Sequence, residues 1–87
     1  MIRLSYTTAA QAELCFRNIA AILGEAGLGL KDIARINAYV TDRAYLGAYM
    51  SVRDRLFEDP APASTLMIVT GFARPEFKVE IEAFAAG

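Results

Sequence analysis

Two hydrophobic spacings divide the chain into segments typical of helices and segments typical of strands. Apolar residues recur every three or four positions over residues 8–26, which predicts an amphipathic helix. Thr7 or Thr8 can cap its start, because a hydroxyl accepts a hydrogen bond from a free N–H of the first turn. Gly27 suits a left-handed stop. The predicted stripe consists of Ala12, Cys15, Phe16, Ile19, Ile22, Leu23 and Ala26.

A second helix is predicted over residues 43–57, with Asp42 as its N-cap. The following segment, EDPAPA, ends it, because proline cannot continue a helix. The residues that mark its inner side are Leu46, Tyr49, Val52, Arg53 and Leu56.

Alternating or continuous apolar runs predict strands at residues 1–6, 33–41, 64–70 and 77–85. Over residues 33–41 the alternation predicts two faces. One face holds Ala34, Ile36, Ala38 and Val40, and the other holds Arg35, Asn37 and Tyr39. Residues 71–75 are predicted to join the last two strands as a hairpin-like loop.

The predicted order is β-α-β-α-β-β within a single domain over residues 1–87. Two amphipathic helices on one sheet form a two-layer α+β fold, here with a mostly antiparallel sheet. Both faces of residues 64–70 are apolar, and Phe84 points opposite to Val79 and Ile81. Helices on one side cannot cover both faces, so we expect a second copy of the chain to bury the other face.

Composition excludes several functional classes. The net charge is −1 and the chain contains no histidine, so catalytic triads with histidine and histidine metal sites are excluded. Like charges form no block, which argues against nucleic-acid binding. The longest apolar stretches, residues 19–23 and 66–69, are too short to span a membrane. A single cysteine and the lack of an apolar leader favour a cytoplasmic protein.

Three segments together suggest a family. They are NIAAILGEAGLGLKDI at residues 18–33, VTD at 40–42, and PAST followed by GFARPEF and KVEIEAFA within 62–85. The chain thereby resembles the YjgF/RidA family of imine and enamine deaminases, also labelled endoribonuclease L-PSP. The resemblance implies a chorismate-mutase-like fold, a homotrimer, and a small-molecule substrate in clefts between subunits. It implies neither a cofactor nor a metal.

The resemblance also assigns roles to particular residues. Glu82 matches the glutamate that positions or activates the attacking water, which makes it the candidate catalytic residue. Ser64 stands where the family has an arginine that holds a substrate carboxylate, and Met50 replaces a frequent asparagine. We also expect the chain to be short at its beginning, because family members start with a further strand pair.

Ser64, Arg74 and Tyr39 are the candidate substrate-binding residues, and each has a simpler alternative. Ser64 can donate to a ligand oxygen or merely begin a strand. Arg74 can supply a displaced cation or remain solvated. Tyr39 can line a cleft or make interface hydrogen bonds, and Glu82 can be a solvated charge on an edge strand.

The resemblance, together with these residues, implies two alternative functions. The first is hydrolysis of reactive imines or enamines to a carbonyl compound and ammonia, with a substrate preference altered by the loss of the arginine. The alternative is a non-catalytic small-molecule-binding or regulatory trimer on the same scaffold. The charge balance and the lack of histidine give the ribonuclease label no support.

Overall fold

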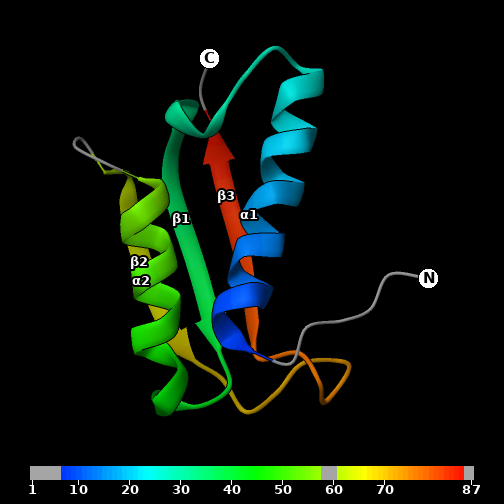
Figure 1. Ribbon diagram of the computed structural model, residues 1–87, viewed down its shortest axis with the longest axis vertical. Helices are drawn as coiled ribbons and strands as arrows, with labels where there is room; N and C mark the ends of the chain where they lie inside the picture. The colour runs from blue at the N-terminus through cyan, green and yellow to red at the C-terminus, as the bar shows by residue number, and fades with distance from the viewer. Residues whose placement is uncertain (1–6, 58–60, 86–87) are drawn as a thin grey trace.

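The computed structural model describes residues 7–57 and 61–85, and it contains two helices packed on one face of a three-stranded sheet (Figure 1). The predicted strand within residues 1–6 lies outside the described residues. The elements are α1 (Thr8–Glu25), a 3₁₀ turn η1 (Leu30–Asp32), β1 (Ile33–Val40), a 3₁₀ turn η2 (Arg43–Tyr45), α2 (Leu46–Leu56), β2 (Ala63–Ile68) and β3 (Val79–Ala85). This is the predicted α+β class.

Thr7 caps α1 as predicted, whereas Asp42 caps the turn η2 and α2 begins three residues later than predicted. The Thr7 hydroxyl accepts a hydrogen bond from the Ala10 N–H at 3.1 Å. The Asp42 carboxylate accepts from the Ala44 N–H at 2.8 Å, and the chain then makes the 3₁₀ turn before α2 begins. After α1, Gly27 adopts a φ of 76°, a left-handed conformation that glycine takes without steric cost.

The strand order β2-β1-β3 corrects one prediction about the sheet. β2 and β3 do not form a hairpin, because β1 lies between them (Figure 1). β1 pairs in parallel with β2 and antiparallel with β3, so the sheet is mixed rather than mostly antiparallel as predicted. The β1–α2–β2 connection returns the chain in the same direction, which fixes the parallel pair. β3 then pairs with the free edge of β1.

The start of β1 departs from simple alternation. The pairing register with β3 shifts between Ile33 and Arg35. As a result Ile33 is buried, and Ala34, which was predicted to face the core, is exposed. From Ile36 onward the predicted alternation is confirmed. An irregularity of this kind moves side chains to the other face without breaking the strand.

The core lies between the helices and the sheet, and aromatic rings fill its centre. Phe16 of α1 stacks near Tyr49 of α2 with ring centroids 6.3 Å apart. It also contacts Phe57 edge-on at 5.3 Å. Phe16 and Tyr49 are fully buried together with Ile36 and Val40 of the central strand. This packing keeps the helices on one face and leaves the other face uncovered.

A buried glutamine joins α1 to the segment before β3. Gln11 is 6% exposed although it lies among the apolar residues of the helix. Its amide nitrogen donates to the Glu76 carbonyl at 2.8 Å, and its amide oxygen accepts from the Lys78 N–H at 2.8 Å. One side chain therefore satisfies two backbone groups and sets where β3 begins.

Replacing Gln11 with methionine is expected to lower the free energy of unfolding by about 1–3 kcal/mol, because two backbone groups lose their partner. Urea denaturation measures the difference. Arg17→Met, at an exposed position of the same helix, should change it by less than about 0.5 kcal/mol. Equal effects of the two substitutions would show that the Gln11 hydrogen bonds contribute nothing.

Candidate functional site

The face of the sheet opposite the helices carries both polar and apolar side chains. Alternation along the three strands places the following residues on it: Arg35, Asn37, Tyr39, Thr65, Met67, Glu80, Glu82 and Phe84. Met67 is 46% exposed and Phe84 is 52% exposed, and both lie on this face. Within the described residues nothing covers this face, which we call the open face.

Two predicted site residues meet on the open face. Asn37 of β1 pairs with Glu82 of β3, and Tyr39 pairs with Glu80, so Tyr39 and Glu82 are diagonal neighbours. The Tyr39 hydroxyl donates to Oε1 of Glu82 at 2.6 Å. This short bond to a carboxylate oxygen holds Glu82 in one orientation and leaves its second oxygen outside that bond.

The bond to Glu82 raises the pKa of Tyr39 from its ordinary value of 10.0, and desolvation and the charges of Glu82 and Glu80 act in the same direction. The folded pKa therefore lies above the unfolded one. The hydrogen bond contributes its full stabilisation at a pH below the unfolded pKa of Tyr39. That stabilisation is lost as the pH rises through the folded pKa. Tyr39 is thus a neutral proton donor at physiological pH.

Glu82→Gln is expected to bring the pKa of Tyr39 back toward 10.0, because the charged acceptor is removed. Ultraviolet titration of phenolate formation measures the shift. Subtracting the titration curve of the matching Tyr39→Phe variant isolates the signal of Tyr39. Asp42→Asn leaves the open face unchanged and serves as the control. A Tyr39 pKa that is the same in the wild type and in Glu82→Gln would contradict the hydrogen bond.

A neighbouring part of the open face contains a polar atom without a partner. An Nη atom of Arg35 donates to the Thr65 hydroxyl at 2.5 Å across β1 and β2. Between that pair and Glu82 lies Asn37, whose Oδ1 is buried and makes no hydrogen bond within the described residues. Buried amide oxygens are usually satisfied, so this one is an exception among the described residues.

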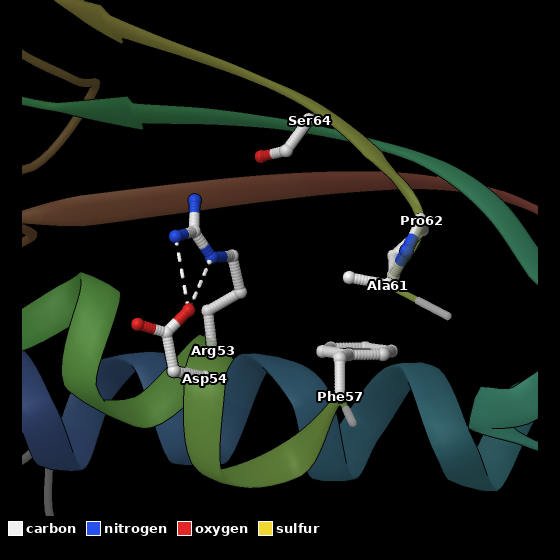
Figure 2. Close-up of a pocket in the computed structure, with 6 residues that line it drawn as sticks. All are labelled: Arg53, Asp54, Phe57, Ala61, Pro62 and Ser64. Carbon is white, nitrogen blue, oxygen red and sulfur yellow. Dashed lines mark hydrogen bonds and ion pairs between the residues drawn. The ribbon is translucent and has the colours of Figure 1, made fainter. Parts of the chain in front are cut away.

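Ser64 lies on the other side of the sheet. It pairs with Ile36 of the helix-facing row and lines a cavity of about 230 Å³ between α2 and the start of β2 (Figure 2). The residues that line this cavity, which we call the α2–β2 pocket, are Arg53, Asp54, Phe57, Ala61, Pro62 and Ser64. Figure 2 shows the Ser64 hydroxyl directed toward the Arg53 side of the pocket.

Arg53 dominates the electrostatics of the α2–β2 pocket. Its guanidinium donates from Nε and Nη2 to Oδ1 of Asp54 at 3.1 and 3.0 Å. It also lies over the Tyr49 ring, 6.0 Å from the centroid. Burial raises the pKa of Tyr49, and Arg53 and then Ser64 oppose that effect. The Tyr49 hydroxyl is buried and makes no hydrogen bond within the described part of the chain.

Arg74 lies apart from the open face and from the α2–β2 pocket. It follows β2 in the connection to β3, is 66% exposed, and donates from Nε to Oε1 of Glu76 at 2.9 Å. The structure therefore brings Tyr39 and Glu82 together. It places Ser64 on the opposite side of the sheet and Arg74 in a loop, where Arg74 pairs with Glu76.

Cys15 belongs neither to the open face nor to the α2–β2 pocket, but lines a separate cavity. It lies beside β3 in an apolar cavity of about 400 Å³ that also contains Ile22 and Phe72. Burial, with a smaller effect of Glu80, raises the pKa of its thiol above 9.0. A protonated thiol is a weak nucleophile, in agreement with a packing role. Over residues 7–57 and 61–85, no three Cys, Asp or Glu side chains come together as a metal site.

The sequence matches the Endoribonuclease L-PSP family over residues 2–87. The chain belongs to this family. Solved structures agree: a member of the YjgF/YER057c/UK114 family from Mycobacterium tuberculosis is 34% identical with a TM-score of 0.90, over 94% of this chain and 70% of that one. RidA from the Antarctic bacterium Psychrobacter is 31% identical with a TM-score of 0.83, over 95% and 65%.

Among curated relatives, the chain is 30% identical over 81 residues to the mitochondrial protein mmf1 of Schizosaccharomyces pombe. That match covers 91% of the chain and 50% of mmf1. The chain therefore spans about half the length of this relative. No helix in the described ranges is long and apolar enough to cross a membrane.

Within this family the chain carries serine at position 64, and the structure shows a guanidinium nearby that sequence reasoning missed. Arg53 was assigned to the inner side of the second helix, among apolar residues. An arginine inside an apolar stripe was the available signal, because such a side chain needs a polar partner or a cavity. The buried Oδ1 of Asn37 left no signal in the sequence, since alternation alone assigned Asn37 to a face.

Proposed function

We propose that this family member hydrolyses reactive imines or enamines to a carbonyl compound and ammonia, with Glu82 as the catalytic residue. Water adds to the imine carbon while Glu82 accepts one of its protons. Glu82 returns this proton to the nitrogen, which gives a carbinolamine. It then accepts the hydroxyl proton and delivers it to the nitrogen as the carbonyl forms, the carbon–nitrogen bond breaks, and ammonia leaves. An enamine first takes a proton at carbon and becomes the imine. One positioned carboxylate can serve both steps, and neither step calls for a redox change.

The observation that carries this proposal is the Tyr39–Glu82 hydrogen bond on the open face. It holds an exposed carboxylate at Oε1, while Oε2 is left for a water molecule. Asn37 lies directly opposite Glu82 in the strand register, and its amide oxygen is buried without a hydrogen bond in the described part of the chain. The resemblance of the VEIEAFA segment to the family is an independent argument for the catalytic role of Glu82.

A homotrimer with substrate clefts between subunits is part of the proposal. The open face exposes Met67 and Phe84, and the helices cover only the opposite side (Figure 1). Burying these side chains against another copy is favourable at roughly 25 cal/mol per Å² of apolar surface. A neighbouring copy would also turn the open face into a cleft around Glu82. A cytoplasmic location stays a prediction, since mmf1 is described as mitochondrial.

An amino-acid oxidase supplies the test, because it releases imines from amino acids in solution. Semicarbazide added to the mixture traps the imine before spontaneous hydrolysis. The protein should lower semicarbazone formation and raise the rate of ammonia release. An unchanged imine lifetime across several aliphatic, aromatic and acidic amino acids would remove the proposal.

The second candidate, a non-catalytic small-molecule binder, is favoured by a specific observation. Within one chain Ser64 lies on the opposite side of the sheet from Glu82. A binding pocket at Ser64 therefore needs no reacting group from Glu82. Ligand-induced thermal stabilisation without turnover supports the binder, whereas turnover that depends on Glu82 excludes it.

A further inference from the structure

We infer that the cavity between α1 and β3 is a binding site for a primary amine with an apolar body, whose ammonium group is held by Glu80. The residues that define this α1–β3 cavity include Cys15, Ile22, Phe72, Phe77, Glu80 and Ile81. The inference does not depend on the proposed hydrolysis, because neither Tyr39 nor Glu82 lines the cavity. It also gives a role to Glu80, which sequence reasoning did not single out.

The α1–β3 cavity has the size and the walls of a small-molecule site. Its volume of about 400 Å³ lies within the roughly 300–1,000 Å³ typical of ligand pockets. Residues of α1 and β3 form two of its sides, and these two elements lie next to each other in Figure 1. The rings of Phe72 and Phe77, from the connection between β2 and β3, also line it. A ligand here meets mostly apolar and aromatic carbon, so its own body is apolar.

Ile22 shows that the cavity is accessible from solvent. Its side chain is 68% exposed, although it belongs to the apolar stripe predicted for α1. Within the described residues β3 pairs with β1 only, so no described strand closes the outer side of β3. An apolar ligand in the cavity would remove part of the Ile22 surface from water, which favours binding.

The charge of the cavity selects the polar group of the ligand. In the described part of the chain, Glu80 is the one charged side chain that lines it. No described arginine or lysine forms an ion pair with Glu80. Asn18 adds an uncharged amide to the lining. A carboxylate without a counter-ion beside apolar walls favours a cationic ligand over a neutral or anionic one.

The carboxylate of Glu80 acts on the interior of the cavity as well as on solvent. Burial raises the pKa of the Cys15 thiol, and the charge of Glu80 adds to this effect, so the two groups interact across the cavity. The rings of Phe72 and Phe77 are a second source of attraction, because aromatic rings stabilise a nearby cation. A primary ammonium group is compact and carries three N–H donors, which suits one carboxylate between apolar walls.

Phenethylamine, which is protonated at neutral pH, and its neutral isostere 2-phenylethanol are the probes. Backbone amide shifts of the ¹⁵N-labelled protein, followed at positions 15, 72 and 81, measure binding. Phenethylamine should bind about three- to fivefold more tightly than 2-phenylethanol, which is the usual contribution of an ion pair with an exposed carboxylate. The anion 3-phenylpropionate has a similar shape and should bind more weakly than either.

Two substitutions separate the charge from the apolar walls. Glu80→Gln should lower the affinity for phenethylamine to that for 2-phenylethanol, about three- to fivefold, and leave 2-phenylethanol binding unchanged. Ile22→Lys adds a cation at an exposed position of the cavity wall. It should weaken phenethylamine binding and strengthen 3-phenylpropionate binding, each by about threefold.

Glu82→Gln is the matched control, because it removes the same charge from the same strand at a position outside the cavity. It should leave the binding of all three compounds unchanged, so a failure of the hydrolysis proposal is distinguishable from a failure here. Equal wild-type affinities for phenethylamine and 2-phenylethanol overturn the inference, as does an unchanged preference in Glu80→Gln. A lack of phenethylamine binding, or shifts confined to other positions, also overturns it. If Glu80→Gln does not fold, Ile22→Lys decides, and wild-type affinities in that variant overturn it.

Discussion

Glu82→Gln is expected to lower the catalysed rate of imine hydrolysis by about 10²–10⁴-fold, the usual contribution of a general acid–base group. The amide keeps the size of the side chain and can still accept from Tyr39 at 2.6 Å in the native geometry. It cannot take a proton from water. The loss should therefore fall on the rate constant rather than on stability. The imine-trapping assay, with thermal unfolding in parallel, measures both.

Glu80→Gln is the matched control for this substitution. Glu80 lies on the same strand and the same face, two residues from Glu82, and also acts on the pKa of Tyr39. It makes no hydrogen bond to Tyr39 in the structure, so its loss should change the rate by less than about threefold. Tyr39→Phe should fall between the two, at about tenfold, because only the orientation of Glu82 is lost. Similar losses in Glu80→Gln and Glu82→Gln would assign the effect to overall charge.

Phe84→Glu is expected to convert the proposed trimer into monomers of 9.5 kDa. Phe84 is 52% exposed on the open face, and a carboxylate there would be desolvated at every subunit contact. That penalty amounts to several kcal/mol, so the dissociation constant should rise by about 100-fold or more. Sedimentation velocity over a dilution series measures the change. Hydrolysis should be lost with the assembly, because the cleft around Glu82 disappears.

Ala21→Glu provides the comparison, since Ala21 is exposed on α1, in the layer on the other side of the sheet. It adds the same charge without touching the open face and should leave the sedimentation unchanged. A wild-type chain that sediments as a monomer at micromolar concentration would contradict the trimer. Assembly retained in Phe84→Glu would place the subunit contacts elsewhere.

Local features of the fold were predictable because they depend on neighbours in the sequence. The caps at Thr7 and Asp42 and the left-handed Gly27 involve contacts within one helical turn. The stripe of α1 is correct at Ala12 and Phe16, whereas Ile22, which was predicted to belong to it, is 68% exposed. The alternation of the strands likewise placed Phe84 opposite Val79 and Ile81, as the register shows. The same alternation assigned Tyr39 and Glu82 each to a face, before any pairing was known.

Strand order and local irregularity were not predictable in the same way. A loop between two consecutive strands suggested a hairpin, but β1 occupies the position between them. Which edges pair depends on how α2 packs over the sheet, and that packing is a long-range property. The shift between Ile33 and Arg35 exposes Ala34 for a related reason, since the register of β3 is set elsewhere.

The sequence by itself determined the α+β class, the start of α1, the two-sided apolar character of the sheet and the resemblance that singles out Glu82. Only the tertiary structure decided which side chains meet. It placed the Tyr39 hydroxyl on Glu82, separated Ser64 from that pair by the thickness of the sheet, and set Arg53 opposite Ser64. The physical reason is that periodicity fixes the direction of a side chain within its own element, whereas the distance between elements follows from packing and strand register.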